Sequence, residues 1–261
     1  MPRTDKPKSN STETAHQNAV IKVIRYMKSH LLEFDIDLSL DELAQQGCYS
    51  KSHLIAVFEE VTGTTPHHFL SSLRIEKAKQ LLISTSDSVT EIALKVGYNS
   101  FGTFSRTFSD YVGYPPSEFR KAPDSLEPCE LIAAVNRFIA QNKTPGTVNF
   151  IEGNILAPPS IEGVIFIGTF TKGVPQGRPE SGTVLLQSDK YRIQRPDTAF
   201  HLLAALVPLH VLGGSSLHLL QSEWVASKHI KDLENSNIDL MLRPSCNTDP
   251  PLVVSLIGLL T

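Results

Sequence analysis

An internal repeat runs through the first half of this chain of 261 residues. The segment Ser39-Leu-Asp-Glu-Leu-Ala returns as Ser88-Val-Thr-Glu-Ile-Ala, 49 residues later. After one inserted residue the offset becomes 50. The matching residues are then, in order, Gly47, Ser50, Leu54, Phe58, Gly63, Pro66 and Phe69 in the first copy, and Gly97, Ser100, Phe104, Phe108, Gly113, Pro116 and Phe119 in the second. So many matches in one order predict two copies of a single structural unit.

Each copy opens with a helix-capping signal. Ser39 is followed by Glu42, and Ser88 by Glu91, at the spacing of a capping box. In such a box the serine oxygen accepts a hydrogen bond from a backbone N–H of the first turn, and the glutamate reaches back to the N–H of the cap. We therefore expect a helix to begin directly after each serine.

A short turn and a second helix follow in both copies. Gly47 and Gly97 fit the tight turn that ends the first helix, and Ser50 and Ser100 can cap the second helix. The second helices carry an apolar stripe toward the core, formed by Leu54, Phe58 and Val61 in the first copy and by Phe104, Phe108 and Tyr111 in the second. Helix, glycine turn and helix is the plan of a helix-turn-helix unit, whose second helix enters the major groove of DNA.

The stretch from Pro66 to about Ile83 predicts one helix between the two units, because a proline stands at its start and no helix breaker follows. At 1.5 Å per residue this helix is about 27 Å long, which suits two reading helices about one DNA turn, roughly 34 Å, apart. A solenoid of paired helices is the structural alternative. Two copies are too few for it, since about three repeats are needed to bury a continuous core.

Several segments of this region follow a known pattern. The most specific are Ser88-Val-Thr-Glu-Ile-Ala-Leu-Lys-Val-Gly-Tyr-Asn-Ser, Phe104-Ser-Arg-Thr-Phe and Gly113-Tyr-Pro-Pro-Ser-Glu-Phe-Arg, preceded by Tyr49-Ser-Lys-Ser-His-Leu, Thr62-Gly-Thr-Thr-Pro and Leu73-Arg-Ile-Glu-Lys-Ala. Through them residues 39–121, about a third of the chain, resemble the AraC/XylS-type DNA-binding domain. The resemblance implies a bacterial transcription regulator with two helix-turn-helix units joined by a long helix.

The resemblance also implies which residues contact DNA. In that family the bases are contacted from exposed positions on the second helix of each unit. These positions are Ser52, Ile55 and Ala56 in the first unit, and Phe101, Gly102, Thr103 and Arg106 in the second. Lys51 and the N-terminal amides of the second helices, at the caps Ser50 and Ser100, suit phosphate contacts.

Departures from the family pattern bear on specificity. The family often carries an arginine where this chain has Ala56, and the acids Glu59 and Glu60 follow. Alanine or isoleucine can contact a thymine methyl group but cannot form the bidentate guanine contact of arginine. In the second unit only Arg106 offers that contact, and a phosphate contact is equally open to it. We therefore expect modest, partly shape-based specificity.

The chain changes character after Lys121. Residues 122–145 contain a polar, proline-bearing linker and then one amphipathic helix, with Leu131, Val135, Phe138 and Ile139 on a single face. From residue 146 onward, short apolar or alternating runs are separated by Gly, Pro, Asp and Asn, as expected of a β-sandwich. This pattern resembles transthyretin-like (prealbumin-like) modules, which implies seven or eight antiparallel strands.

The expected fold class is therefore multidomain, all-α followed by β. A disordered N-terminal tail covers residues 1–17, and residues 18–121 form the double helix-turn-helix domain. The linker with its helix covers residues 122–145, and residues 146–261 form an antiparallel β-sandwich that serves as an effector or dimerisation domain.

Composition and motifs exclude several other functions. Residues 1–121 hold 14 basic and 14 acidic residues, and residues 122–261 hold 10 and 13, so charge alone does not indicate a nucleic-acid partner. Three widely spaced cysteines and scattered histidines predict no metal site and no cofactor. The G-x-S-x-G and P-loop motifs are missing, so an enzyme is not expected. No apolar run is long enough for a membrane span and the first residues are polar, which favours a cytoplasmic protein.

Two functions from different classes fit these features. The first is a sequence-specific regulator of transcription, an activator in contact with RNA polymerase, that binds two adjacent major-groove segments of double-stranded DNA and can form a homodimer. The alternative is a protein-interaction adaptor whose repeat binds DNA weakly or non-specifically, which Ala56 and the neutral charge of residues 1–121 favour. The intact caps, turns and apolar stripes of both units favour the regulator more strongly.

Overall fold

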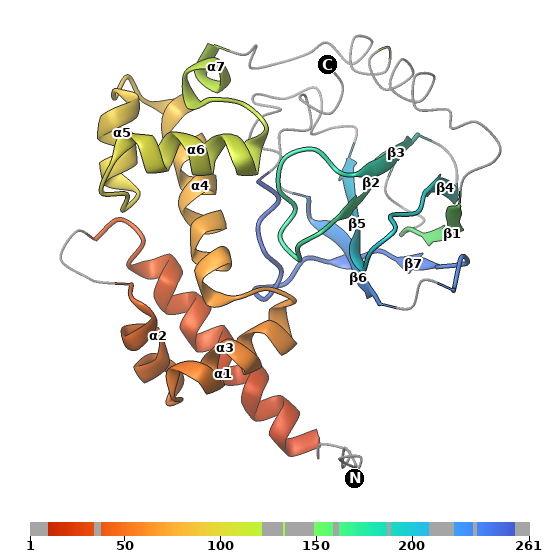
Figure 1. Cartoon of the computed structure of the whole chain (residues 1–261), viewed down its shortest axis with the longest axis horizontal. Helices are drawn as coiled ribbons and strands as arrows, with labels where there is room; N and C mark the ends of the chain where they lie inside the picture. The colour runs from red at the N-terminus through yellow and green to blue at the C-terminus, as the bar shows by residue number, and fades with distance from the viewer. Residues whose placement is uncertain are drawn as a thin grey trace.

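The computed structural model describes residues 10–33, 38–121, 133, 149–158, 162–186, 189–208, 222–231 and 234–253. Within them a helical part and a β part lie side by side (Figure 1). The helices are α1 (Asn10–Ser29), α2 (Leu40–Gly47), α3 (Lys51–Thr62), α4 (Pro66–Ser84), α5 (Val89–Lys95), α6 (Phe101–Val112) and α7 (Pro116–Lys121). None of these described helices is long and apolar enough to cross a membrane. The amphipathic helix expected within residues 122–145 falls, but for Ala133, outside the described residues.

The helical part has two hydrophobic cores, one at each end of α4. In the first, Ile24 and Met27 of α1 pack with Leu54 and Phe58 of α3, and all four side chains are fully buried. The second core gathers apolar side chains of α4 to α7, among them Ile75, Leu82, Ile92, Phe104, Phe108 and Phe119. The predicted units therefore each have a core of their own.

Helix α4 belongs to both cores. Phe69 and Leu70 at its start pack in the first core, while Ile75, Ala78 and Leu82 pack in the second. Its 19 residues correspond to a length of about 28 Å, and its bounds match the expected helix to within one residue. Figure 1 shows α4 running from the α2–α3 pair to the α5–α6 pair.

Helix α1 begins earlier than expected. It starts at Asn10, so residues 10–17 are helical and the prediction of a disordered tail over residues 1–17 is wrong for them. These residues are polar and carry no apolar periodicity that would predict a helix. Two features favour this segment. The Glu13 carboxylate lies in the first turn, where negative charge interacts favourably with the helix dipole, and the His16 ring lies edge-on to the rings of Tyr49 and His53.

The capping boxes differ between the units. In the second unit the box is complete, since the Ser88 N–H donates to Glu91 Oε2 at 2.7 Å and the Glu91 N–H donates to Ser88 Oγ at 3.2 Å. In the first unit the Glu42 N–H donates to Ser39 Oγ at 3.4 Å. The Glu42 carboxylate there accepts from the hydroxyl of Tyr26 at 3.0 Å instead, which joins α2 to α1.

The turn of the first unit corrects the alignment of the repeat. Cys48, not Gly47, has the positive φ of 57°, and Gly97 has a φ of 85° in the second unit. The Tyr49 N–H donates to Ala44 O, as the Tyr98 N–H donates to Ala93 O, each at 2.9 Å. This pattern is the Schellman motif, in which the residue after the helix adopts the left-handed conformation.

Cys48 is therefore the counterpart of Gly97, and the inserted residue is Asn99, which follows the turn. Gly47 has a different structural role, which is close packing of α2 against α1. A Cβ added to it would lie 3.2 Å from Cγ2 of Val23, so a side chain here would require Val23 to shift by a few tenths of an ångström. Sequence identity alone paired two glycines that have different structural roles.

Replacing Cys48 by glycine is expected to stabilise the protein by about 0.5–1 kcal/mol, because glycine adopts positive φ without the steric cost that other residues meet. Thermal unfolding of the full chain measures the change. Gly97→Ala is the matched control in the second unit and should destabilise, since its φ is also positive and the added Cβ would lie 3.0 Å from Arg74 Nη2. A Cys48→Gly variant that is no more stable than the parent would contradict this account of the turn.

Within the described residues the β part consists of two sheets. The strands are β1 (Phe150–Leu156), β2 (Gly163–Phe170), β3 (Ser181–Leu185), β4 (Lys190–Gln194), β5 (Phe200–Pro208), β6 (Trp224–Ile230), β7 (Leu240–Met241) and β8 (Arg243–Pro244). One sheet has the order β4-β1-β7 and the other β3-β2-β5-β6-β8. Apolar side chains from both sheets, such as Ile151, Ile193, Ile167 and Leu202, share one buried core. The expected purely antiparallel arrangement is wrong at one pair, because β1 and β7 are parallel.

Candidate nucleic-acid interface

The residues expected to contact DNA lie on the N-terminal halves of α3 and α6 or at their caps. Nine of them are exposed and Ile55 is half-buried. The exposed residues are Ser50, Lys51, Ser52 and Ala56 in the first unit and Ser100, Phe101, Gly102, Thr103 and Arg106 in the second. Both helices turn their buried stripe, which includes Leu54 and Phe104, away from this surface. The structure thus brings the candidates together in two groups, one on each unit.

Serine caps fix where both helices begin. Ser50 Oγ accepts from the His53 N–H at 3.4 Å, and Ser100 Oγ accepts from the Thr103 N–H at 3.2 Å. Ser100 also donates its hydroxyl hydrogen bond to the Thr103 hydroxyl at 3.0 Å. The two serines therefore hold the first turn of each helix and orient the residues that follow.

Lys51 and Arg106 are the charged residues among the ten candidates. Lys51 Nζ lies 2.8 Å from Oδ1 of Asp41, and both side chains are more than half exposed. Solvent screens such a pair strongly, so it contributes little to stability. Because its charge is partly compensated by Asp41, Lys51 attracts a phosphate less than a free lysine does. Arg106 is exposed on α6.

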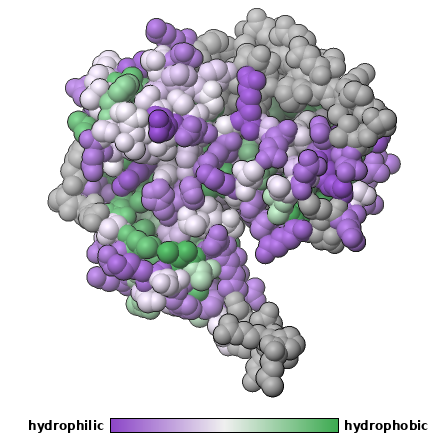
Figure 2. Space-filling model, in the orientation of Figure 1, coloured by the Kyte–Doolittle hydropathy of each residue, from purple (hydrophilic) through white to green (hydrophobic). Residues whose placement is uncertain are grey.

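Apolar side chains occur at the second group as well. Phe101 of the second group and Leu94 of the preceding helix α5 are each 49% exposed, whereas most large apolar residues of the helical part are buried. Figure 2 shows the visible face of the helical part as largely hydrophilic, with separate apolar patches. An exposed ring at the first position of α6 can contact a thymine methyl group or a sugar.

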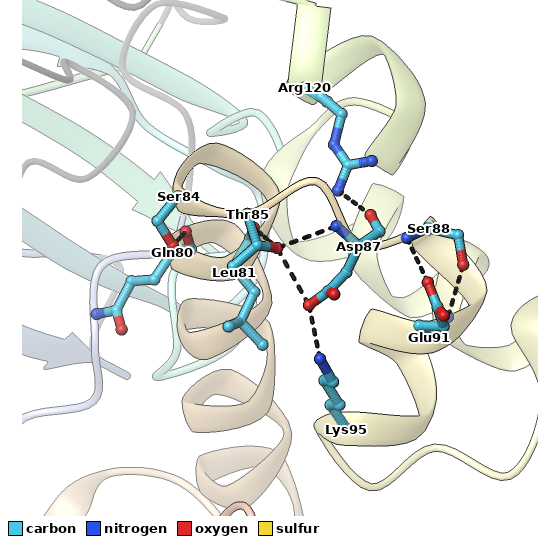
Figure 3. A network of polar contacts seen from close by, with 9 residues as sticks. All are labelled: Gln80, Leu81, Ser84, Thr85, Asp87, Ser88, Glu91, Lys95 and Arg120. Atoms are coloured by element: carbon cyan, nitrogen blue, oxygen red, sulfur yellow. Dashed lines mark hydrogen bonds and ion pairs between the residues drawn. The ribbon is translucent and has the colours of Figure 1, made fainter.

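A polar network holds the second unit against the end of α4 (Figure 3). Lys95 Nζ lies 2.7 Å from Oδ2 of Asp87, and this contact is the main reason why the pKa of Asp87 falls below its usual value. Thr85 Oγ1 donates to Leu81 O at 2.8 Å and so ends α4. Arg120 of α7 donates to Leu82 O at 3.1 Å and to Asp87 O at 2.6 Å. Three elements are thereby joined just before the helix pair that carries the second group.

Arg120→Ala is expected to destabilise the protein by about 1.5–3 kcal/mol, because two backbone carbonyls lose a charged donor and Leu82 O is among the last carbonyls of α4. Urea unfolding followed by circular dichroism measures this loss. The neighbouring Lys121 is exposed, and Lys121→Ala should change stability by less than about 0.5 kcal/mol. If Arg120→Ala and Lys121→Ala lowered the free energy of unfolding equally, the hydrogen bonds of Arg120 would not stabilise the protein as we expect.

Sequence reasoning missed two residues at this surface. Arg120 was part of the family pattern, but its contacts with α4 and the segment before α5 depend on tertiary structure. His53 is exposed on the first turn of α3, and its ring lies edge-on to that of Tyr49, with centroids 4.5 Å apart. Its place directly after Ser52, which was predicted to contact bases, was the signal available in the sequence.

Within the described part of the chain, no group of three His, Cys, Asp or Glu side chains is arranged to hold a metal ion. Burial raises the pKa of Tyr98 to about 12, so its phenol is protonated at neutral pH and serves in packing against Phe104. The chemistry offered by this surface is therefore hydrogen bonding, apolar contact and a modest positive charge.

Comparison with known proteins covers the helical part. Residues 43–122 match a family model described as a helix-turn-helix domain. An uncharacterised helix-turn-helix-type transcriptional regulator of Staphylococcus aureus (strain COL) is 39% identical over 105 residues, which is 40% of this chain and 14% of that protein. The melibiose operon regulatory protein of Escherichia coli (strain K12) is 29% identical over 117 residues, 43% of this chain and 39% of that protein. The chain therefore matches well under half of the length of either relative.

Among solved structures, an AraC-type transcriptional regulator from Chromobacterium violaceum is 30% identical, with a TM-score of 0.38, over 41% of this chain and 94% of that one. The DNA-binding domain of AdpA, solved in complex with a target DNA, is 26% identical, with a TM-score of 0.38, over 40% and 91%. Together, the family match and the regulator relatives show that residues 43–122 form a helix-turn-helix domain of the kind found in transcriptional regulators, in the same region whose motifs resemble the AraC/XylS type.

Proposed function

We propose that this protein is a transcription regulator that binds double-stranded DNA with α3 and α6 in two adjacent major-groove segments. The observation that carries the proposal is the matched exposure of the candidate residues on both units. Each second helix has a serine cap, an exposed N-terminal half and a buried opposite face. This is the geometry that a helix needs to enter a major groove from its N-terminal end.

The ten candidate residues have different roles in this proposal. Arg106 and Phe101 contact base edges or thymine methyl groups, and Thr103 and Gly102 allow close approach of α6. Ser52, Ile55 and Ala56 contact the first segment through small or apolar groups, while Lys51 and the helix N-termini at Ser50 and Ser100 contact phosphates. The first segment is therefore read more weakly than the second.

The remaining parts of the proposal concern the whole protein. We propose a cytoplasmic activator that contacts RNA polymerase, in which the β part, a transthyretin-like sandwich, serves in pairing two chains or in sensing an effector. The regulator relatives support this assignment at the level of transcription control. The alternative, a protein-interaction adaptor that binds DNA weakly, is favoured by the Lys51–Asp41 ion pair, which compensates a charge at the first group.

Selection of bound duplexes from random and genomic DNA, with the full chain and at two salt concentrations, tests the proposal. We expect a motif of two short blocks about one helical turn apart, and binding that weakens steeply as salt rises because phosphate contacts release counterions. Enrichment of a single block would indicate that only α6 recognises a specific base sequence. No enrichment at either salt concentration would contradict the regulator and favour the adaptor.

A further inference from the structure

The segment between β2 and β3 reaches the first helix-turn-helix unit. We call residues 171–180 the β2–β3 loop. In this loop Gly173 is buried, and a Cβ added to it would lie 2.1 Å from the carbonyl oxygen of Gly63. Gly63 is the C-cap of α3, with a φ of 72°. The backbone of the loop therefore packs directly against the C-terminal end of α3. We call α3 and α6, the helices proposed to enter the major groove, the two reading helices.

The same loop also contacts the second unit. Val174 is fully buried and is part of the core that contains Phe108 and Val112 of α6. Three residues further on, the Gly177 N–H donates to the carbonyl oxygen of Tyr111 at 3.0 Å. Tyr111 lies in the last turn of α6. One loop of the β part is thus packed into the second unit and hydrogen-bonded to the end of its reading helix.

The two contacts fall at corresponding corners of the repeat. Gly63 caps α3 and its counterpart Gly113 caps α6, both in the left-handed conformation. The loop therefore touches the C-terminal end of each reading helix, opposite the N-terminal halves that carry the candidate DNA contacts. Another link between the units lies beside it, where Nδ1 of His68, at the start of α4, is 3.2 Å from the hydroxyl of Tyr111.

We infer that the β2–β3 loop sets the distance and angle between α3 and α6, and thereby the spacing between the two DNA segments that the protein accepts. Gly173, Val174 and Gly177 are its positioning residues. This inference rests on the proposed function, since it assigns a source of specificity to the same DNA surface. A small rotation at the contacted C-terminal end of α3 or α6 moves the DNA-contacting N-terminal end by a large distance, because each helix has 12 residues and is about 18 Å long. A rotation of about 10° at the pinned end moves the other end by about 3 Å, close to the rise of one base pair.

The first experiment uses the two short sequence blocks recovered by the duplex selection described above. It measures the affinity of the full chain for duplexes in which these blocks are moved closer together or further apart by one or two base pairs. The parent protein should prefer one spacing by about tenfold or more. Gly173→Ala and Val174→Asp should weaken binding at that spacing about three- to tenfold and reduce the preference over the shifted duplexes by a similar factor. Thr171→Val changes an exposed residue of the same loop and should leave the spacing profile unchanged.

A second measurement needs no DNA and so separates this inference from the proposed function. Spin labels at Ser52 and Thr103, with Cys48, Cys129 and Cys246 changed to serine, report the distance between the two reading helices. The parent should give one narrow distribution, and the Gly173→Ala chain a broader or displaced one. If the parent binds no duplex, the proposed function fails and the spin labels alone decide the role of the loop.

An unchanged distance distribution and an unchanged spacing profile in a folded Gly173→Ala chain would overturn the inference. Val174→Asp introduces a charge into a core and can prevent folding, in which case Gly173→Ala carries the decision. A parent chain with a broad distribution, or with no preferred spacing, would also overturn it.

Discussion

Replacing Phe108 by alanine is expected to destabilise the protein by about 3–5 kcal/mol, the cost of removing a fully buried aromatic ring from a close-packed core. Phe108 is 0% exposed, and its ring centroid lies 5.6 Å from that of Phe104 and 5.4 Å from that of Phe119. Because small domains are stable by only about 5–15 kcal/mol, such a loss removes a large share of the total. Denaturant unfolding of the full chain measures it.

Phe101 supplies the matched control, because it lies on the same helix and is 49% exposed. Phe101→Ala should leave stability within about 0.5 kcal/mol of the parent, and it should weaken binding to the selected duplex. Phe108→Ala should reduce DNA binding only as far as it unfolds the second unit. A Phe108→Ala chain that loses less than about 1 kcal/mol would contradict the assignment of this ring to the core.

Arg106→Ala is expected to weaken binding to the best selected duplex by about 5- to 150-fold, which corresponds to the 1–3 kcal/mol of a bidentate contact with guanine. Arg106 is the exposed arginine of α6, on the face that the buried stripe leaves open. Binding to random duplex should fall much less, because base contacts are formed only at the correct sequence. Competition binding at constant salt concentration measures both affinities.

Arg25→Ala is a suitable control for this experiment. Arg25 is exposed on α1, outside both helix-turn-helix units, so its removal changes the net charge by the same amount without touching α3 or α6. It should alter both affinities slightly and to the same extent. If Arg106→Ala lowers the affinity for the best and the random duplex equally, Arg106 contacts phosphates and the bases are read by other residues.

The sequence was sufficient to predict the helical elements wherever local signals agreed. Serine caps, apolar stripes and Pro66 each act within a few residues, and α3, α4 and α6 begin where those signals lie. The candidate DNA residues are exposed for the same reason, since the periodicity that buries Leu54 also turns Ser52 and Ala56 outward.

The errors arose where partners distant in sequence decide the structure. Glu42 has the spacing of a capping box but accepts from Tyr26 of α1, which no local pattern indicates. Cys48 occupies a left-handed position that favours glycine, so pairing Gly47 with Gly97 by residue type was misleading. The burial of Val174 in the second unit could not be predicted either, because the residue lies in a loop of the β part and no local sequence pattern indicates which core it joins.

The makeup of the two helical cores has a consequence for biosynthesis. The buried residues of the first core lie between Val20 and Leu73, so this core can assemble once the early part of the chain has left the ribosome. The second core includes Val174 and Val253, from far along the chain. Since a chain emerges from its N-terminus, the first unit can fold well before the second has all its parts. The newly made protein therefore completes the cores around α3 and α6 at different times, and the second core is complete only after Val253 has been made.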